Sequence, residues 1–531
     1  MSMSVRADTG GDSMPTQVLE SGGLKVKLEP ISGGRHEIVE DPQGFLANSS
    51  LGSELKGARH RVVSFQTEDD EDTDEPVNFE AIVYDYTNRR TLVASGSVDD
   101  PSTADMTETS RHPRPDPDEL AEAVEILKRD PELGPDIESG ALEPYQAMPP
   151  LLNNTLPDGS VERTINVGLY SARRDVRHRF AAVNMVTSRT TLGPTGAPHE
   201  HHRDCGVPGV DSCPPSRGSG KVRVTVTKGS EELWSLVVVK PANSSGANGS
   251  GVELKHVRYR GDKVLHQAHV PILNVEYERT GNLDGCGPSY RDWQNEEACF
   301  KAEGDNVLPG YRACTEPAET IFESGRDGGN FRGVAFYIRN QQLFLVSELA
   351  AGWYRYASEW RLHEDGTIRP RFGFNAVRNP CTCKPHHHHA YWRFDFDVAE
   401  KPETVQEFND PPLEGDRNWH DIKRETRRRK RPTSERKWRV RNTDGKGYEL
   451  IPGAGDGQAD DFGVGDMWVV RKRQGELEDG FGPDRARIEQ FVNNQPVKDE
   501  RLVVWYAGHF RHSPTGNGDH IVGPRLEPFN W

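Results

Sequence analysis

The sequence predicts a mainly β protein in which a large antiparallel β-sandwich follows a small α+β domain. From residue 221 onward, short alternating or β-branched runs recur, separated by Gly, Asp and Asn turns. A segment with helical periodicity lies earlier in the chain. The 52 glycines and 37 prolines among 531 residues indicate many turns and loops. Together these observations favour sheet packed on sheet over a helical architecture.

Residues 1–55 lack hydrophobic periodicity and are rich in Gly, Ser and Asp, so they predict a flexible tail. Residues 56–205 predict the small α+β domain. Its helix begins after Asp116, with Pro117 at the first helical position and Glu119 as the partner in a capping box. Strands are predicted on both sides of this helix, for example in NFEAIVYDYTNRRTLVASGSV.

Residues 206–220 form a linker by composition, and residues 221–531 form the predicted β-sandwich with the functional site. Three histidines lie just before the linker: His199, His201 and His202. They suit either a metal site or a solvated loop. The solvated loop is favoured because no second group of ligands lies near them in the sequence.

The net charge of −17 argues against general nucleic-acid binding, which needs a basic face. A basic segment at 423–437 is either a nuclear-targeting or nucleic-acid patch or, as we favour, a solvated loop between strands. No apolar run is long enough to predict a membrane span. The N-terminal residues have no apolar core of the signal-peptide kind, so we expect a protein that stays inside the cell or lacks its leader here.

Seven cysteines leave at least one thiol unpaired if all pairing is within the chain. Cys381 and Cys383 lie next to a run of histidines and suggest zinc. The signal is weak, because paired zinc ligands usually have two to four residues between them.

Four consecutive histidines, at 386–389, are the strongest chemical signal. In an extended strand alternate side chains share a face, so His386 and His388 lie together, while His387 and His389 face away toward packing or solvent. Two imidazoles on one face suit a metal ion, and the last part of the chain offers a third in His509, His512 or His520. Three imidazoles suit Cu(II) or Zn(II), with copper favoured at equal access. The alternative is a solvated loop.

At this point the chain resembles the copper amine oxidases that use a topaquinone cofactor. Members of this family carry H-x-H followed by R-x-D-x-D, and here His386 and His388 are followed by Arg393, Asp395 and Asp397. The family's third copper histidine lies seven residues after a tryptophan. Trp505 is here followed at that distance by His512. The resemblance covers most of residues 60–531.

The resemblance also implies the other parts of a catalytic site. Tyr354, in GWYRY before a DGTI turn, takes the position of the tyrosine that becomes the quinone. Asp292 takes the position of the catalytic base, and Tyr277 and Tyr290 are candidates to bind the quinone oxygen. Asp395 and Asp397 correspond to a peripheral calcium-type site, with an ion-paired strand as the equal alternative.

The function implied is oxidation of a primary amine by O2, with copper and topaquinone, in a homodimer. The chain departs from the family pattern at two neighbours of Tyr354. Trp353 replaces Asn and Arg355 replaces an acidic residue, and we expect both to narrow the pocket and to disfavour cationic diamines. The alternative function is a copper-binding β-sandwich protein that lacks the quinone and is non-catalytic or has another oxidase activity.

Overall fold

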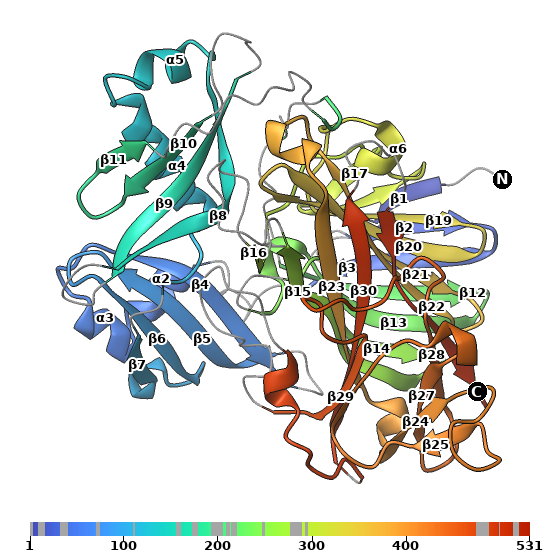
Figure 1. The fold of residues 1–531 in the computed structure, drawn as a ribbon. Helices are drawn as coiled ribbons and strands as arrows, with labels where there is room; N and C mark the ends of the chain where they lie inside the picture. Colours follow the sequence, from blue (N-terminus) through green and yellow to red (C-terminus); the bar gives the residue numbers. More distant parts are fainter. Residues whose placement is uncertain are drawn as a thin grey trace.

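The structure is a computed structural model of the chain. The residues that it describes are 4–8, 16–31, 41–70, 75–109, 112–155, 161–171, 179–192, 205–208, 213, 220–246, 250–276, 289–291, 296–473, 488–498, 500–512 and 520–531. Two small sheets lie to one side of a large β body (Figure 1). The predicted fold class, mainly β with a large antiparallel sandwich preceded by α+β structure, is confirmed.

In the described residues, two sheets of twelve strands each form the large body, and the main hydrophobic core contains side chains from both. The order in the first sheet is β1 (Ser4–Asp8), β2 (Thr16–Ser21), β3 (Leu24–Pro30), β12 (Lys221–Lys228), β13 (Glu231–Val239), β14 (Glu253–Tyr259), β15 (Asp262–Glu276), β23 (His386–Phe396), β30 (Leu502–His512), β29 (Met467–Arg471) and β26 (Thr426–Arg428), with β16 (Ser289–Arg291) also paired to β15.

The order in the second sheet is β17 (Gly304–Leu308), β18 (Tyr311–Cys314), β19 (Val334–Arg339), β20 (Gln342–Ala351), β21 (Tyr354–His363), β22 (Ile368–Ala376), β32 (Arg525–Phe529), β28 (Gly447–Ile451), β27 (Lys437–Asn442), β24 (Glu403–Phe408) and β25 (Trp419–Asp421), with β31 (His520–Val522) paired to β22. The pair β18–β19 is parallel, and the other strand pairs of this sheet are antiparallel in the described residues.

The described part of the region predicted as one small α+β domain contains two four-stranded sheets, and each sheet contributes most of one hydrophobic core. The first sheet has the order β4 (His60–Asp69), β5 (Pro76–Asp85), β6 (Arg90–Ser97) and β7 (Asp105–Thr109). The second has the order β11 (Arg189–Leu192), β10 (Arg179–Asn184), β9 (Val161–Tyr170) and β8 (Glu143–Thr155). Helices α4 (Pro117–Lys128) and α5 (Gly134–Glu138) pack on the second sheet.

The predicted start of helix α4 is confirmed, since the Asp116 side chain accepts a hydrogen bond from the backbone N–H of Glu119. Glu119 itself is buried, and its carboxylate binds the Tyr86 hydroxyl and the Arg163 guanidinium. The glutamate therefore joins a buried ion pair, which the local capping pattern does not reveal.

The prediction of a flexible tail is wrong for residues 16–30. Strands β2 and β3 form a hairpin whose turn, Gly22-Gly23, has positive φ at both residues, and β3 pairs with β12. A two-stranded hairpin is only marginally stable alone. It is ordered here because Leu24, Val26 and Leu28 are buried in the main core. Two short helices follow, α2 (Pro42–Leu46) and α3 (Ser50–Glu54), and both pack on the first small sheet.

Disulfides account for most of the described cysteines. Cys205 bonds Cys383, Cys213 bonds Cys299, and Cys381 is also disulfide-bonded. The suggestion of zinc at Cys381 and Cys383 is therefore wrong, because a disulfide sulfur is not a thiolate ligand. Cys314 is free and buried.

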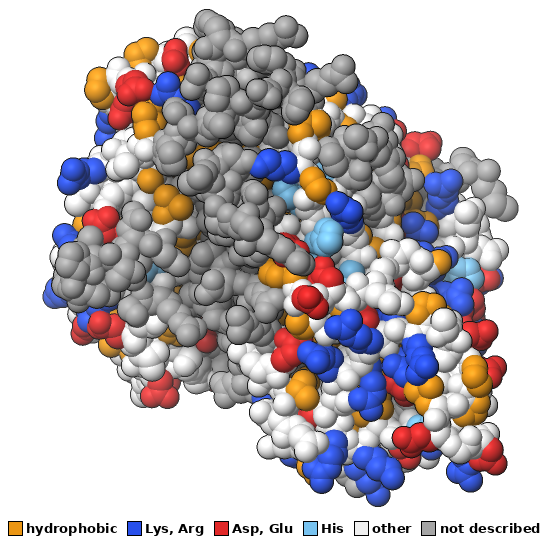
Figure 2. Space-filling model, in the orientation of Figure 1, with side chains coloured by type: hydrophobic (Ala, Val, Ile, Leu, Met, Phe, Trp, Pro, Cys, Tyr) orange, Lys and Arg blue, Asp and Glu red, His pale blue; other side chains and the backbone are white. Residues whose placement is uncertain are grey.

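The basic segment at 423–437 is more ordered than a solvated loop. Thr426–Arg428 pairs with β29, and Lys430 is buried. Figure 2 shows basic and acidic side chains interspersed on the visible face of the large body. Within the described part of the chain, no helix is long and apolar enough to cross a membrane.

Candidate active site between the two large sheets

Strand β23 carries the four histidines and directs them to its two faces. His386 and His388 are fully buried on the face that meets the second sheet, whereas His387, on the other face, is partly exposed. His386 lies directly opposite His512 of the neighbouring strand β30. The predicted alternation therefore holds, and it gathers three imidazoles on the core side.

Tyr354 reaches these histidines from the opposite sheet. It begins β21 after a two-residue turn, Gly352-Trp353, in which Gly352 has positive φ, as the first position of a type II′ hairpin turn requires. The Tyr354 hydroxyl forms a short hydrogen bond with Nδ1 of His386 and lies 3.1 Å from Nδ1 of His512. A phenol from one sheet and two imidazoles from the other thus meet inside the core.

The third imidazole, His388, is held by neighbouring aromatic residues. Its Nδ1 lies 3.0 Å from the Tyr356 hydroxyl, and its ring stacks on Phe374 with 4.0 Å between centroids. The Tyr354 ring meets His388 edge-on at 4.7 Å. These contacts fix the orientation of both rings.

Electrostatics favour a neutral imidazole at His386. Burial, together with the charges that His512, Lys384 and His387 can carry, lowers the pKa of His386 to about 3. A neutral imidazole keeps a lone pair for a metal ion or for the phenol proton. Three buried imidazoles beside one phenol are donors that copper accepts, so the residues present fit a copper ion by their chemistry.

Several predicted residues cannot be placed at this site. Tyr277 and Asp292 lie outside the described residues, as do His199, His201 and His202. The backbone of Tyr290 pairs with Val275 in β16 beside β15, but its side chain lies outside the described part.

The carboxylates predicted for calcium are both in ion pairs. Asp395 is buried, and it lies 2.9 Å from Lys472 and 3.7 Å from Arg501. Asp397 lies 3.0 Å from Lys263. Neighbouring cations oppose a divalent ion, so these contacts favour the ion-paired alternative.

Arg355 lies away from the candidate site. Its side chain is on the face of β21 opposite to Tyr354, and Nε and Nη2 bind the two carboxylate oxygens of Asp327 at 2.8 and 2.9 Å. The expectation that Arg355 narrows the pocket is wrong, because adjacent strand residues face opposite sides. Trp353 is buried, and its ring lies 6.3 Å from those of Tyr354 and Tyr145, the latter from β8.

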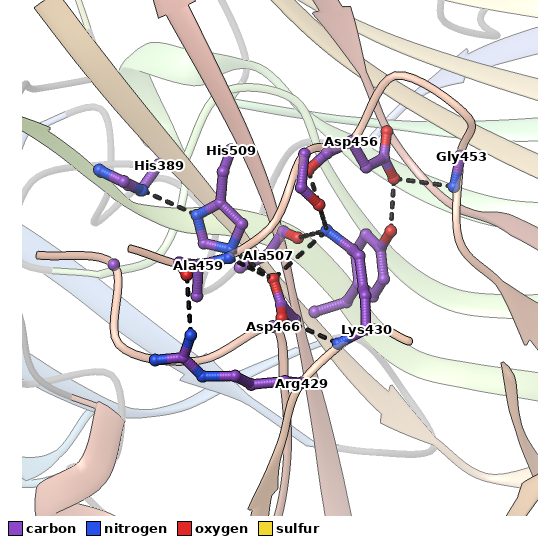
Figure 3. Close-up of polar contacts among 12 residues, drawn as sticks. His389, Arg429, Lys430, Gly453, Asp456, Ala459, Asp466, Ala507 and His509 are labelled. Carbon is purple, nitrogen blue, oxygen red and sulfur yellow. Dashed lines mark hydrogen bonds and ion pairs between the residues drawn. The ribbon is translucent and has the colours of Figure 1, made fainter. Parts of the chain in front are cut away.

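The outer face of β23 holds a second polar arrangement that the sequence did not predict. His389 is buried, and its Nδ1 lies 2.7 Å from Nδ1 of His509, whose Nε2 lies 2.9 Å from Asp466 (Figure 3). Beside it, ligand atoms of Glu276, His387 and Asp460 all lie within 4.8 Å of one another. The signal in the sequence was that four histidines make two H-x-H pairs, one for each face.

The fold is similar to that of three solved oxidases. A copper-containing benzylamine oxidase from Hansenula polymorpha gives a TM-score of 0.59 at 13% identity, over 94% of this chain and 97% of that one. An Aspergillus nidulans amine oxidase gives a TM-score of 0.55 at 12% identity, over 94% of this chain and 90% of that one. Pichia pastoris lysyl oxidase gives a TM-score of 0.57 at 11% identity, over 94% of this chain and 89% of that one.

No protein-family model and no curated protein matches the chain. At 11–13% identity the structural likeness concerns the fold alone. Over nearly its whole length the chain therefore shares the fold of copper amine oxidases, and this relationship is one of structure.

Proposed function

We propose that the chain is a copper-dependent oxidase of primary amines, with a quinone formed from Tyr354. The reaction converts amine, O2 and water into aldehyde, ammonia and hydrogen peroxide. The observation that carries this proposal is the Tyr354 hydroxyl, which lies between Nδ1 of His386 and Nδ1 of His512 in a buried space. The shared fold supports the proposal without identifying a substrate.

In this proposal His386, His388 and His512 hold the copper. Copper and the quinone together supply electron transfer to O2 and the carbonyl that captures the amine. Nδ1 of His386 and Nδ1 of His512 both lie beside the phenol oxygen of Tyr354. Without the ion, one of these nitrogens accepts the single phenol hydrogen, because a neutral imidazole has one lone pair for either the hydrogen or the metal. Formation of the quinone adds two oxygen atoms to the ring and removes two hydrogens, with two O2 consumed and one hydrogen peroxide released.

The remaining roles rest on the resemblance in sequence. Asp292 is the proposed base that removes the α-proton of the bound amine, which requires a pKa near the working pH. Tyr277 and Tyr290 are the proposed hydrogen-bond donors to the quinone oxygen. A homodimer belongs to the same set of proposals, whereas the ion pairs of Asp395 and Asp397 make calcium the less favoured role for these two carboxylates.

A second function, copper binding without a quinone, is favoured by a specific observation. The Tyr354 ring is fully buried, with the rings of His388 at 4.7 Å and Phe374 at 5.2 Å. Close packing leaves little space around the ring for two added oxygen atoms. In this alternative the phenol remains a tyrosine that orients the metal-binding imidazoles.

Phenylhydrazine labelling separates the two functions. The full chain is loaded with copper in air, treated with phenylhydrazine and digested, and the peptide that contains Tyr354 is weighed. An adduct is expected on wild type and on Tyr337→Phe, which alters another buried tyrosine of the same sheet. It should be absent in Tyr354→Phe. Full copper occupancy with an unmodified Tyr354 would favour the second function and overturn the first.

A further inference from the structure

The outer face of strand β23 holds a compact group of three potential metal ligands. His387 lies directly opposite Glu276 of β15, and its Nδ1 is 4.0 Å from a Glu276 carboxylate oxygen. The same nitrogen is 3.0 Å from a carboxylate oxygen of Asp460. Among the described residues, these three form the group of His, Cys, Asp or Glu side chains whose ligand atoms all lie within 4.8 Å of one another.

These distances suit one metal ion. Zinc binds imidazole nitrogen and carboxylate oxygen at about 2.0–2.2 Å, so two ligand atoms of one ion lie about 3 to 4 Å apart. Both distances from His387 fall in that range. The group offers two carboxylates against one imidazole, and a divalent cation offsets this excess of negative charge.

A fourth donor, His389, lies beside the group, with its Nε2 3.8 Å from the other oxygen of Asp460. A hydrogen bond to His509, which in turn contacts Asp466, orients its ring. The Asp466 carboxylate is only an acceptor, so Nε2 of His509 carries the proton and the neutral ring accepts at Nδ1. Nδ1 of His389 then donates to His509. The Nε2 of His389 is consequently the nitrogen with the lone pair, and it is the nitrogen that lies 3.8 Å from Asp460.

Asp460 is held in place before any ion binds. One of its oxygens accepts hydrogen bonds from the backbone N–H groups of Phe462 and Gly463, at 2.9 and 2.7 Å. The loop can approach the histidines this closely because residue 463 is a glycine. A Cβ atom there would lie 2.6 Å from Nδ1 of His389.

A buried polar network anchors the two ends of this loop (Figure 3). Asp456 accepts from the backbone N–H of Gly453 and from the Tyr506 hydroxyl, at 2.9 and 2.5 Å. Asp466 accepts from the backbone N–H groups of Ala459 and Lys430, both at 2.8 Å. A ligand on a loop with fixed ends costs little ordering entropy when an ion binds.

We propose that Glu276, His387 and Asp460, with His389 as the fourth donor, form a second metal site for a divalent transition ion such as Zn2+. The site lies on the face of β23 opposite to His386 and His388 and shares no ligand with the core-face site. Two imidazoles and two carboxylates suit zinc in four-coordinate geometry. The inference does not depend on the proposed oxidase function.

Zinc binding by the metal-free full chain tests this site, with equilibrium dialysis against Zn2+ alone followed by metal analysis. Wild type is expected to hold one equivalent of zinc more than Asp460→Asn or Glu276→Gln, or to bind that equivalent at least about tenfold more tightly. Asp461→Asn is the matched control, because this neighbouring aspartate is exposed. His386→Ala should retain the equivalent that Asp460→Asn loses.

Thermal unfolding, measured with and without zinc, distinguishes a variant that has lost the zinc site from one that fails to fold. Zinc should raise the Tm of wild type and of Asp461→Asn, since an ion that binds only the folded state stabilises it. The rise should be smaller in Asp460→Asn and in Glu276→Gln. Equal zinc content and equal Tm shifts in wild type and both variants would overturn the site and leave the group as an ion pair.

Discussion

The two faces of strand β23 carry the same H-x-H pattern but meet different surroundings. On the core face, His386 and His388 meet a phenol, an aromatic ring and a third imidazole, all buried between two sheets. On the outer face, His387 and His389 meet carboxylates from a neighbouring strand and from a loop. Alternation along the strand therefore assigns each histidine to a face, whereas the elements that face it decide its chemistry.

The largest expected effect is the difference in copper content between a histidine substitution on the core face of β23 and one on its outer face. In an Asp460→Asn background, which weakens outer-face binding, we expect His386→Ala to lose copper and His387→Ala to keep it. His386 lies against Tyr354 and His512, but His387 is on the opposite side of the sheet. The measurement is copper content after desalting from one equivalent of copper. Equal loss in both variants would contradict the assignment of two separate faces.

Asp466→Asn should cost about 3–5 kcal/mol of unfolding free energy at pH 7, because it removes the carboxylate that lies 3.7 Å from the buried Lys430 ammonium and leaves Asp456 as the remaining acidic neighbour. Burial raises the pKa of Asp466, but the hydrogen bond from His509 and the charge of Lys430 lower it to a net value below the usual range. The stabilisation is therefore fully present above about pH 4, the ordinary Asp pKa, and is lost as pH falls through the folded pKa.

Urea unfolding of wild type and Asp466→Asn at several pH values measures this effect. The difference between the two proteins should shrink below about pH 4. Asp461→Asn, in the same loop but exposed, should stay within about 0.5 kcal/mol of wild type at every pH. A difference that does not change with pH would show that Asp466 acts without its charge.

Gly463→Ala should have a smaller effect, confined to the outer face. The added methyl group would lie 2.6 Å from Nδ1 of His389, and relieving this contact should cost about 1–3 kcal/mol. Gly455→Ala is the control, because its nearest atom would be 3.6 Å away. Urea unfolding compares the two, and equal stabilities would mean that the loop moves aside freely.

Much of the architecture followed from local patterns. Period-two alternation predicted the β-rich body and the two faces of β23, and Asp116 predicted the start of α4. The division of residues 56–205 into two sheets was missed, because strand patterns alone do not say which strands pair. The ordered strands at residues 16–30 were not predicted, because a short hairpin gains its stability from the sheet that it joins.

By itself, the sequence determined which residue types were available and on which side of its strand each histidine lies, because both depend only on the chain and on backbone geometry. Tertiary structure decided their partners. Tyr354 meets His386 from the other sheet, and Asp460 meets His387 from a loop 73 residues later in the chain. Such contacts depend on how distant segments pack, and burial and charge at the meeting point then set the chemistry of each imidazole.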